Sequence, residues 1–384
     1  MINTLETRKK DIKKVIKSLD ITPSMFKNAE EKYKNIAKFL NEHGLNVDIS
    51  LQGSFAIGTA TKPYSEGKDK EYDIDVICLF KDTESNPKTI RDNLVSTLSS
   101  SEVYSDKLTE WPKCFTLEYA KFGDYDFSID LVPTVVDNNS NIGSKNISLE
   151  YLTNVLKIAT NEDKYDWYTI NPKGYQKWFN DVNKRFALYN KEYRMRQMFE
   201  ENKSFYASVE EIPEYFNKSA LQEAIQLLKR SRDIYFSKIH KEKNKPSSII
   251  ITTFAALVAK DLLTDIDSID LAFEVVKRLS FYSTENLYSQ ISVPIIKRNN
   301  RWEFFNPVNS TDNLLDSWNE EQENSKLFFK WIEKAKNDLN ELTNTVNTDY
   351  IDILGNSFGN EIVDKLFKRV RTETITTGVK PYYE

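Results

Sequence analysis

Two acidic side chains stand at the head of an apolar stretch of the sequence. Asp73 and Asp75 lie in YDIDVICLF, residues 72–80, whose other residues predict a buried β-strand. Side chains alternate between the two faces of a strand, so we expect both carboxylates on the same face. Two like charges held side by side repel each other, and a divalent cation would neutralise them. The pair therefore predicts a metal site that needs further ligands.

A third carboxylate, Asp130, lies in the segment FSIDLVPTV, residues 127–135. Alternation places the apolar residues of this expected strand on one face and Ser128 with Asp130 on the other. If the strand lies beside residues 72–80, the three acids meet at one point. Three carboxylates on adjacent strands can hold two Mg²⁺ ions about 3.5–4 Å apart, an arrangement that supports in-line phosphoryl displacement; Mn²⁺ is an alternative metal. The other explanation is that these acids cap loops at strand ends or pair with lysines.

A glycine and a serine follow another expected strand, in LQGSFAIG, residues 51–58. Gly53 would let the backbone approach a phosphate, and the Ser54 hydroxyl and nearby N–H groups would donate hydrogen bonds to it. The spacing fits neither a Walker loop nor the dinucleotide-binding glycine motif. An ordinary helix N-cap is the alternative role for Ser54. The functional interpretation gains weight because the two acids follow Ser54 after 19 residues.

The first part of the chain mixes helices with strands. Apart from the strand of residues 72–80, the patterns predict a strand ending at Gly53 and a hairpin around the turn KFGD, residues 121–124. The expected helices and hairpin strands cover residues 23–43, 86–101, 113–120 and 125–136.

From about residue 175 onward, apolar residues recur mostly at helical spacing. The sequence therefore predicts an α+β, bilobal fold. We expect a mixed-sheet lobe over residues 1–174, which includes the N-terminal helix, and a helical lobe over residues 175–384 that closes a cleft.

Composition narrows the class of protein. The chain has 384 residues, a net charge of −5, two cysteines and two histidines. This excludes most Cys/His zinc sites and a disulfide framework, and it argues against a sequence-blind nucleic-acid coat protein. The basic stretch at 240–245 is interpreted as a surface loop. The start of the chain lacks the apolar core of a secretory signal, and no segment approaches a membrane span, so we expect a cytoplasmic protein.

The acidic and glycine–serine motifs resemble those of a known superfamily. QGSFAIGT, YDIDVICLF and FSIDLVPTV are similar to the G-S, D-x-D and third-aspartate motifs of the DNA polymerase β-like nucleotidyltransferases. Within that superfamily, the sequence resembles the bacterial cGAS/DncV-like nucleotidyltransferases of CBASS antiphage systems. The resemblance extends from about residue 50 to about residue 320 and includes segments at 169–179, 221–236, 245–256 and 304–318.

The resemblance implies a fold and an activity. The fold would be a polymerase β-like core with a C-terminal helical lobe. The activity would be synthesis of a cyclic di- or trinucleotide second messenger from NTPs, ATP among them, with release of pyrophosphate. A downstream effector would bind the product, and neither a stable nucleic-acid partner nor a membrane is implied.

The resemblance also implies roles for residues of the acidic and glycine–serine motifs. Asp73 and Asp75 would bind both metal ions. Asp130 would complete the metal site and help to remove the proton from the acceptor hydroxyl. Ser54, presented next to Gly53, would contact the donor triphosphate.

Three further residues are candidates for nucleotide contacts. Lys229, followed 19 residues later by Ser248, is similar to the lysine and serine that hold the phosphates in this family, with Arg230 and Ser247 as adjacent alternatives. A solvated helix flank is the other explanation for Lys229, and a helix cap is the other explanation for Ser248. Asn171 could offer its amide to a nucleobase edge or could be a turn residue.

Two other functions remain open from the sequence. One is a nucleotidyltransferase with a linear product or with an RNA or protein acceptor. The other is a catalytically silent scaffold that binds nucleotides. A phosphatase degrades only linear products, so it distinguishes the first alternative from a cyclic oligonucleotide synthase. NTP binding without pyrophosphate release would favour the second alternative.

Overall fold

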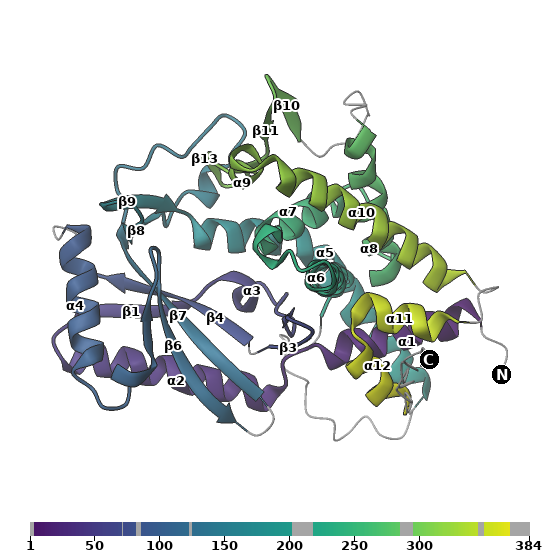
Figure 1. The fold of residues 1–384 in the computed structure, drawn as a ribbon, viewed down its shortest axis with the longest axis horizontal. Helices are drawn as coiled ribbons and strands as arrows, with labels where there is room; N and C mark the ends of the chain where they lie inside the picture. The colour runs from purple at the N-terminus through teal and green to yellow at the C-terminus, as the bar shows by residue number, and fades with distance from the viewer. Residues whose placement is uncertain are drawn as a thin grey trace, which may run out of the picture.

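The computed structural model describes most of the chain as two halves packed side by side. Figure 1 shows the strands of the large sheet with helices α2 and α4 on one side of the molecule and most of the remaining helices on the other. The end of the predicted KFGD turn, residues 123 and 124, lies outside the described residues. The described residues are 4–70, 72–81, 86–122, 125–201, 218–284, 295–344 and 349–368.

A seven-stranded mixed sheet forms the first half. β4 and β7 are parallel neighbours, whereas the other pairs in this sheet are antiparallel. The predicted hairpin is confirmed, because β6 pairs antiparallel with β7. The strands lie in the order β1 (Val47–Leu51), β4 (Tyr72–Phe80), β7 (Tyr125–Val136), β6 (Phe115–Phe122) and β5 (Leu108–Glu110), and β8 (Leu156–Asn161) pairs with both β7 and β9 (Tyr165–Ile170).

Helices α2 (Pro23–Glu42) and α4 (Pro87–Ser99) form one hydrophobic core with this sheet. Each begins with a side-chain cap and a proline: the Thr22 side chain accepts from the backbone N–H of Met25 in α2, and the Asn86 side chain accepts from that of Thr89 in α4. The strand residues in this core alternate along the chain, and in β4 and β7 they are Tyr72, Ile74, Val76, Cys78, Phe80, Phe127, Ile129, Leu131 and Val135. Their polar neighbours must therefore face away from α2 and α4.

The second half is helical, with α6 (Ala220–Lys238) at its centre. A capping box starts α6: the Ser219 hydroxyl accepts from the backbone of Gln222, and the Gln222 side chain accepts from the backbone of Ser219. Most residues of α6 are buried, including the charged residues Glu223, Lys229, Arg230, Arg232 and Asp233. The other helices are α5 (Pro172–Glu201), α7 (Ser248–Ala259), α8 (Ser268–Ser280), α9 (Asp316–Glu320), α10 (Gln322–Thr343), α11 (Tyr350–Phe358) and α12 (Asn360–Phe367).

Helix α1 (Leu5–Ser18) was not among the expected elements. It contributes Ile12, Val15 and Ile16 to the core of the helical half, although it precedes the sheet in the chain. The Tyr350 hydroxyl of α11 donates to the Asp11 carboxylate of α1 at 2.6 Å. The helical half therefore draws on both ends of the described chain. The division between residues 174 and 175 stays a prediction.

Several short elements complete the fold. Helix α3 (Gly53–Ala56) follows β1 directly, where the sequence predicts a turn or short helix. None of the helices described in the structure is long and apolar enough to cross a bilayer. Three small hairpins pair β2 (Tyr64–Ser65) with β3 (Lys68–Asp69), β10 (Ile296–Arg298) with β11 (Arg301–Glu303), and β12 (Phe305–Asn306) with β13 (Asn309–Asn313).

Candidate active site

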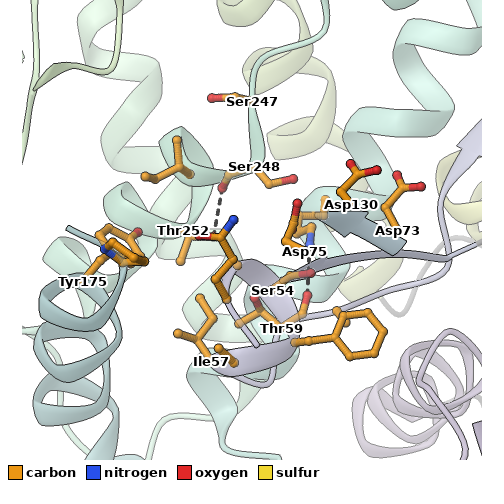
Figure 2. Close-up of a pocket in the computed structure, with 18 of the residues that line it drawn as sticks. Ser54, Ile57, Thr59, Asp73, Asp75, Asp130, Tyr175, Ser247, Ser248 and Thr252 are labelled. Atoms are coloured by element: carbon orange, nitrogen blue, oxygen red, sulfur yellow. Dashed lines mark hydrogen bonds between the residues drawn. The ribbon is translucent and has the colours of Figure 1, made fainter. Parts of the chain in front are cut away.

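A cavity of about 720 Å³ lies between the sheet and helices α6 and α7. This volume lies within the range of about 300–1,000 Å³ that is usual for small-molecule sites. Figure 2 shows the carboxylates of the sheet facing the start of α7 across this space. The two sides of the cavity carry opposite charges. The sheet side includes Asp73, Asp75 and Asp130, and the helical side includes Lys229, Arg232 and Lys245.

Strand register brings the three acids of the sheet together. In the parallel pair of β4 and β7, Asp75 lies opposite Asp130, and Asp73 lies opposite Ser128. The prediction that the two strands are neighbours is therefore confirmed. Figure 2 shows the carboxylates of Asp73, Asp75 and Asp130 on the same side of these strands.

Two hydroxyl groups orient two of these carboxylates. Ser128 Oγ donates to Asp73 Oδ1 at 2.9 Å, and Thr116 Oγ1 donates to Asp130 Oδ1 at 2.5 Å. Thr116 is placed for this contact because it lies opposite Asp130 in the antiparallel pair of β6 and β7. Each hydrogen bond uses one oxygen of its carboxylate. Among the described residues, the second oxygen of each carboxylate has no hydrogen bond, so it can bind a ligand.

Burial and neighbouring carboxylates raise the proton affinity of two of the acids, Asp75 and Asp130. Burial raises the pKa of Asp75 to about 7, and the nearby charges of Asp130 and Asp73 add to this effect, while Lys229 opposes it. Burial and the charge of Asp73 also raise the pKa of Asp130, against the hydrogen bond from Thr116. The site therefore disfavours the charged form of Asp75 and Asp130 unless a cation is bound.

The donor set is suited to a hard divalent cation. Within the described parts of the chain, no three Asp, Glu, His or Cys side chains are already arranged as a metal-binding group. The chemistry nevertheless fits, because burial and then the repulsion between carboxylates raise the pKa of Asp75 and of Asp130, and a bound cation would stabilise their charged forms. Mg²⁺ commonly uses one or two carboxylates together with water and substrate phosphates, so it needs few protein ligands.

Gly53 lies directly against one of the acids. Its φ of +61° is a conformation that glycine adopts readily, and a Cβ atom here would lie 2.4 Å from Asp75 Oδ2. The backbone N–H of Gln52 donates to the carbonyl of Asp75 at 2.9 Å, and this bond holds the start of α3 against β4. Ser54 is the second residue of α3, whereas Gln52 holds the N-cap position, so the N-cap explanation for Ser54 is wrong. Ser54 instead lines the cavity.

Lys229 points from α6 into the same cavity. It is 6% exposed, so the prediction of a solvated helix flank is wrong. Its Nζ donates to the carbonyl of Thr59 at 3.0 Å. Burial and the charge of Arg232 lower the pKa of Lys229 to about 8, while Asp233 and Asp75 oppose this shift.

Arg230, the adjacent alternative to Lys229, has a structural role. Its Nε donates to the carbonyl of Phe358 at 2.7 Å, and its Nη2 forms an ion pair with Asp69 at 2.7 Å. It is not among the residues that line the cavity. The geometry therefore favours Lys229 over Arg230 for a contact to phosphate.

Two cations that the sequence did not single out join Lys229. Arg232 Nη1 donates to Ser248 Oγ at 3.1 Å, and Arg232 Nη2 lies 2.7 Å from Asp233. Lys245 Nζ lies 3.2 Å from the same Asp233 carboxylate. Burial alone would raise the pKa of Asp233, but Arg232 and Lys245 lower it. The interpretation of residues 240–245 as a surface loop is wrong for Lys245, which lines the cavity.

The remaining candidates differ in how freely they could contact a ligand. Ser247 holds the N-cap position of α7 and Ser248 is the first helical residue, and both line the cavity. Asn171 Nδ2 donates to the carbonyls of Tyr151 at 2.8 Å and Val308 at 3.0 Å, and Asn171 Oδ1 accepts from the backbone of Gly174 at 3.0 Å. Because both amide hydrogens are used, a base contact by the Asn171 amide is not supported, and the turn-residue explanation fits.

Comparisons with known proteins agree with this geometry. Residues 7–183 match the family described as the Second Messenger Oligonucleotide or Dinucleotide Synthetase domain. A relative from Roseivirga ehrenbergii named c-di-GMP synthase is 31% identical over 371 residues, which cover 94% of this chain and 86% of the relative. The chain belongs to the cGAS/DncV-like nucleotidyltransferases. It is therefore an enzyme of nucleotidyl transfer, in a family that synthesises cyclic oligonucleotides.

Other relatives of this nucleotidyltransferase extend the comparison. The cyclic dinucleotide synthase CdnG of Bradyrhizobium diazoefficiens is 24% identical over 256 residues, which cover 63% of this chain and 56% of the relative. The solved structure of CdnG in complex with GTP has a TM-score of 0.66 at 18% identity and covers 94% of this chain and 97% of that one.

A second solved structure is more distant. Vibrio cholerae DncV in complex with the linear intermediate pppA(3′,5′)pG has a TM-score of 0.52 at 16% identity and covers 82% of this chain and 70% of that one. Together the two solved structures confirm the predicted α+β fold with a C-terminal helical region.

Proposed function

We propose that this cGAS/DncV-like nucleotidyltransferase joins two NTPs, GTP among them, into a cyclic dinucleotide at the cavity between the sheet and α6. The observation that carries the proposal is the pairing of opposite charges across one cavity: three carboxylates on β4 and β7 face Lys229, Arg232 and Lys245. The name of the Roseivirga relative supports GTP as a substrate. Use of ATP, which the sequence favours, stays a prediction.

In this mechanism, the acids act on the metals and on the acceptor. Asp73, Asp75 and Asp130 would hold two Mg²⁺ ions, with Mn²⁺ as an alternative. When bound, such ions offset the charge of the acids and of the phosphates. The Thr116 hydroxyl keeps the Asp130 carboxylate oriented, so that Asp130 helps to take the proton of the acceptor hydroxyl.

The opposite wall would hold the triphosphate of the donor. Lys229, Arg232 and the Ser248 hydroxyl line the cavity on that wall, and the Ser54 hydroxyl lines it beside the acids. All four groups can donate to phosphate oxygens. The 3′- or 2′-hydroxyl oxygen of the acceptor attacks the α-phosphorus of the donor. The bond from that phosphorus to the bridging oxygen breaks, and pyrophosphate leaves. A second attack of the same kind closes the ring. Positioning and charge stabilisation supply most of the rate.

The proposal extends to a cellular role. The product would act as a second messenger in a CBASS antiphage system, where a downstream effector would bind it in the cytoplasm. The support for this part is the resemblance of the sequence to the CBASS nucleotidyltransferases.

The double variant Asp73→Asn with Asp75→Asn tests the proposal. We expect pyrophosphate release from NTPs and Mg²⁺ to fall by at least about a thousandfold, because both proposed metal-binding groups lose their charge. Asp48→Asn is the matched control, since Asp48 is an exposed acid on β1 that pairs with Lys81. Thermal unfolding of all proteins checks that the fold is intact.

Mass spectrometry and phosphatase digestion then identify the product. A cyclic product has no terminal phosphate to lose, so it survives the phosphatase, whereas a linear product is degraded. Full activity in the double variant would refute the assignment of the acids. A product that the phosphatase degrades would instead favour a linear polymerase.

A further inference from the structure

One end of the cavity is formed by the β12–β13 hairpin, whose side chains the proposed mechanism does not use. Asn306 and Asp312 of this hairpin line the cavity. Two donors hold the Asp312 carboxylate: the Tyr168 hydroxyl lies 3.3 Å from Oδ1, and Asn306 Nδ2 lies 2.9 Å from Oδ2. Because one donor holds each oxygen, the plane of the carboxylate is fixed, and each oxygen keeps a lone pair for another donor.

The hairpin itself is firmly anchored. Phe304, just before β12, stacks on Phe254 of α7 with ring centroids 4.2 Å apart, and both rings are fully buried. The Val308 carbonyl between the strands accepts from Asn171, which caps α5. The Asp312 carboxylate is thus presented from a rigid support, as a group that selects between ligands must be.

An apolar surface adjoins this carboxylate. Ile158 of β8 and Ile170 of β9 line the cavity. Tyr168 lies opposite Ile158 in the strand register, and it shares a face of β9 with Ile170 because the two are two residues apart. The surface therefore runs from Ile170 to Tyr168, whose hydroxyl reaches Asp312. A flat heterocyclic ring can lie on such a surface while its polar edge meets the carboxylate.

A cation lies over the ring of the same tyrosine. Lys113 lines the cavity, and its Nζ lies 4.6 Å from the centre of the Tyr168 ring. Its ion pair with Glu162 is long, at 3.5 Å, and both side chains are largely exposed, so Lys113 can turn toward a ligand at little cost. A carboxylate and an ammonium group therefore flank Tyr168 at this end of the cavity.

This arrangement matches one nucleobase better than the others. The Watson–Crick edge of guanine presents two adjacent donors, N1–H and N2–H, beside the acceptor O6. A carboxylate can accept from both donors, and a lysine can donate to O6. Adenine would turn the lone pair of its N1 toward the carboxylate, which is repulsive.

We propose that Asp312 selects guanine by accepting hydrogen bonds from its N1–H and N2–H groups, with Lys113 donating to O6. The proposal rests on the proposed function, in that it requires an NTP to bind in this cavity. Asp312 acts here as a specificity-determining residue and takes no part in the transfer of the nucleotidyl group.

The test compares GTP with ITP, which lacks the 2-amino group, in wild type and in Asp312→Asn. We expect wild type to prefer GTP over ITP by about tenfold to a hundredfold in kcat/KM. In Asp312→Asn this ratio falls to within about threefold of unity, because an amide cannot accept from both donors with a carboxylate's strength. Asp316→Asn is the matched control: Asp316 follows the same hairpin, bonds to Asn313 and Arg301, and does not line the cavity. It should keep the wild-type ratio.

Further measurements make every outcome informative. If Asp312→Asn does not fold, 1-methyl-GTP tests the same contact in wild type, because N1 of this nucleotide carries no hydrogen. Equal use of GTP, ITP and 1-methyl-GTP by wild type overturns the proposal. An unchanged GTP-to-ITP ratio in Asp312→Asn also overturns it. If wild type releases no pyrophosphate from any NTP, the proposed function fails, and calorimetric binding of GTP and ITP still decides the guanine contact. Activity with ATP alone would overturn the guanine assignment and leave nucleotidyl transfer intact.

Discussion

The sheet side of the cavity (the sheet wall, with Asp73, Asp75 and Asp130) and its helical side (the helix wall, with Lys229, Arg232 and Lys245) carry opposite charges. The two walls balance these charges in different ways. On the sheet wall, the partners of the acids include hydroxyls, and burial and mutual repulsion raise the pKa of both Asp75 and Asp130. On the helix wall, Asp233 lies between Arg232 and Lys245 and pairs with both. The helix wall thus neutralises part of its own charge, whereas the sheet wall does not.

This difference shows what each wall requires of a ligand. Buried charges that are already paired keep their geometry without a ligand, so the helix wall can hold its shape before a nucleotide binds. Carboxylates without a positive partner either take up a proton or bind a cation. The carboxylates of the sheet wall therefore become fully ionised only when a cation is bound. Three experiments can break or sharpen this comparison.

The largest effect is expected from Gly53→Ala, which disturbs the sheet wall by steric contact. The new methyl group would lie 2.4 Å from Asp75 Oδ2 and would displace that carboxylate. We expect pyrophosphate release to fall by at least about a hundredfold, since a displacement of about 1 Å can cost that much.

Gly44→Ala is the matched control for this substitution. Gly44 also has a positive φ, +86°, but a Cβ there meets nothing within 4 Å. It should cost about 1–2 kcal/mol of stability from backbone strain alone and leave turnover unchanged. Equal activity in the two alanine variants would show that Gly53 does not position Asp75.

A smaller effect is expected when the pH rises from 6 to 8: the ratio of folded to unfolded protein should fall by about tenfold. The pKa of Asp75 is raised to about 7, so folded protein holds a proton at pH 6 that the unfolded chain has released. Stability therefore falls as the pH rises from 6 to 8, by about 1 kcal/mol for this group. Urea unfolding of wild type without metal, compared with Asp75→Asn, measures this difference.

Mg²⁺ sharpens the pH experiment. A cation that binds the ionised carboxylate should restore stability at pH 8 and have much less effect at pH 5, where Asp75 is protonated. If the stability of wild type and that of Asp75→Asn depend on pH in the same way, the pKa of Asp75 is not raised in the folded protein. The contrast between the two walls would then disappear.

The smallest effect is expected from serine substitutions on the helix wall. Ser248 Oγ accepts from Arg232, and its hydroxyl hydrogen remains for a phosphate oxygen. Ser248→Ala should raise the KM for NTP by about threefold to tenfold, the value of one hydrogen bond. Ser247→Ala should change KM by less than about twofold. The reverse ranking would move the phosphate contact to Ser247.

The acidic site was predictable because its signal is local. Strand periodicity alone places Asp73 and Asp75 on one face and separates Asp130 from its apolar neighbours, and β4 and β7 proved to be adjacent. Helix α1 also left a signal that the prediction overlooked. Ile12, Val15 and Ile16 follow helical spacing, and all three are buried.

The rest of the cavity was not predictable from single segments. Arg232 and Lys245 resemble many surface cations in sequence, and only the packing of α6 against the loop before α7 brings them to one carboxylate. Asp312 likewise becomes notable only because β12–β13 lies beside β9. Asn171 shows the opposite error: its amide is suited to a nucleobase, but the backbone around it uses both hydrogens. Such outcomes depend on contacts between residues far apart in the chain.

The bond from Arg230 to the Phe358 carbonyl has a consequence for how the enzyme is made. Arg230 is a neighbour of Lys229 on α6, and the carbonyl that it contacts lies 128 positions later in the chain. On the ribosome, the strands that carry the three acids are complete while α11 is still unsynthesised. A nascent chain would therefore complete the strands of its acidic site before the contact between Arg230 and Phe358, which supports the basic helix α6, can form.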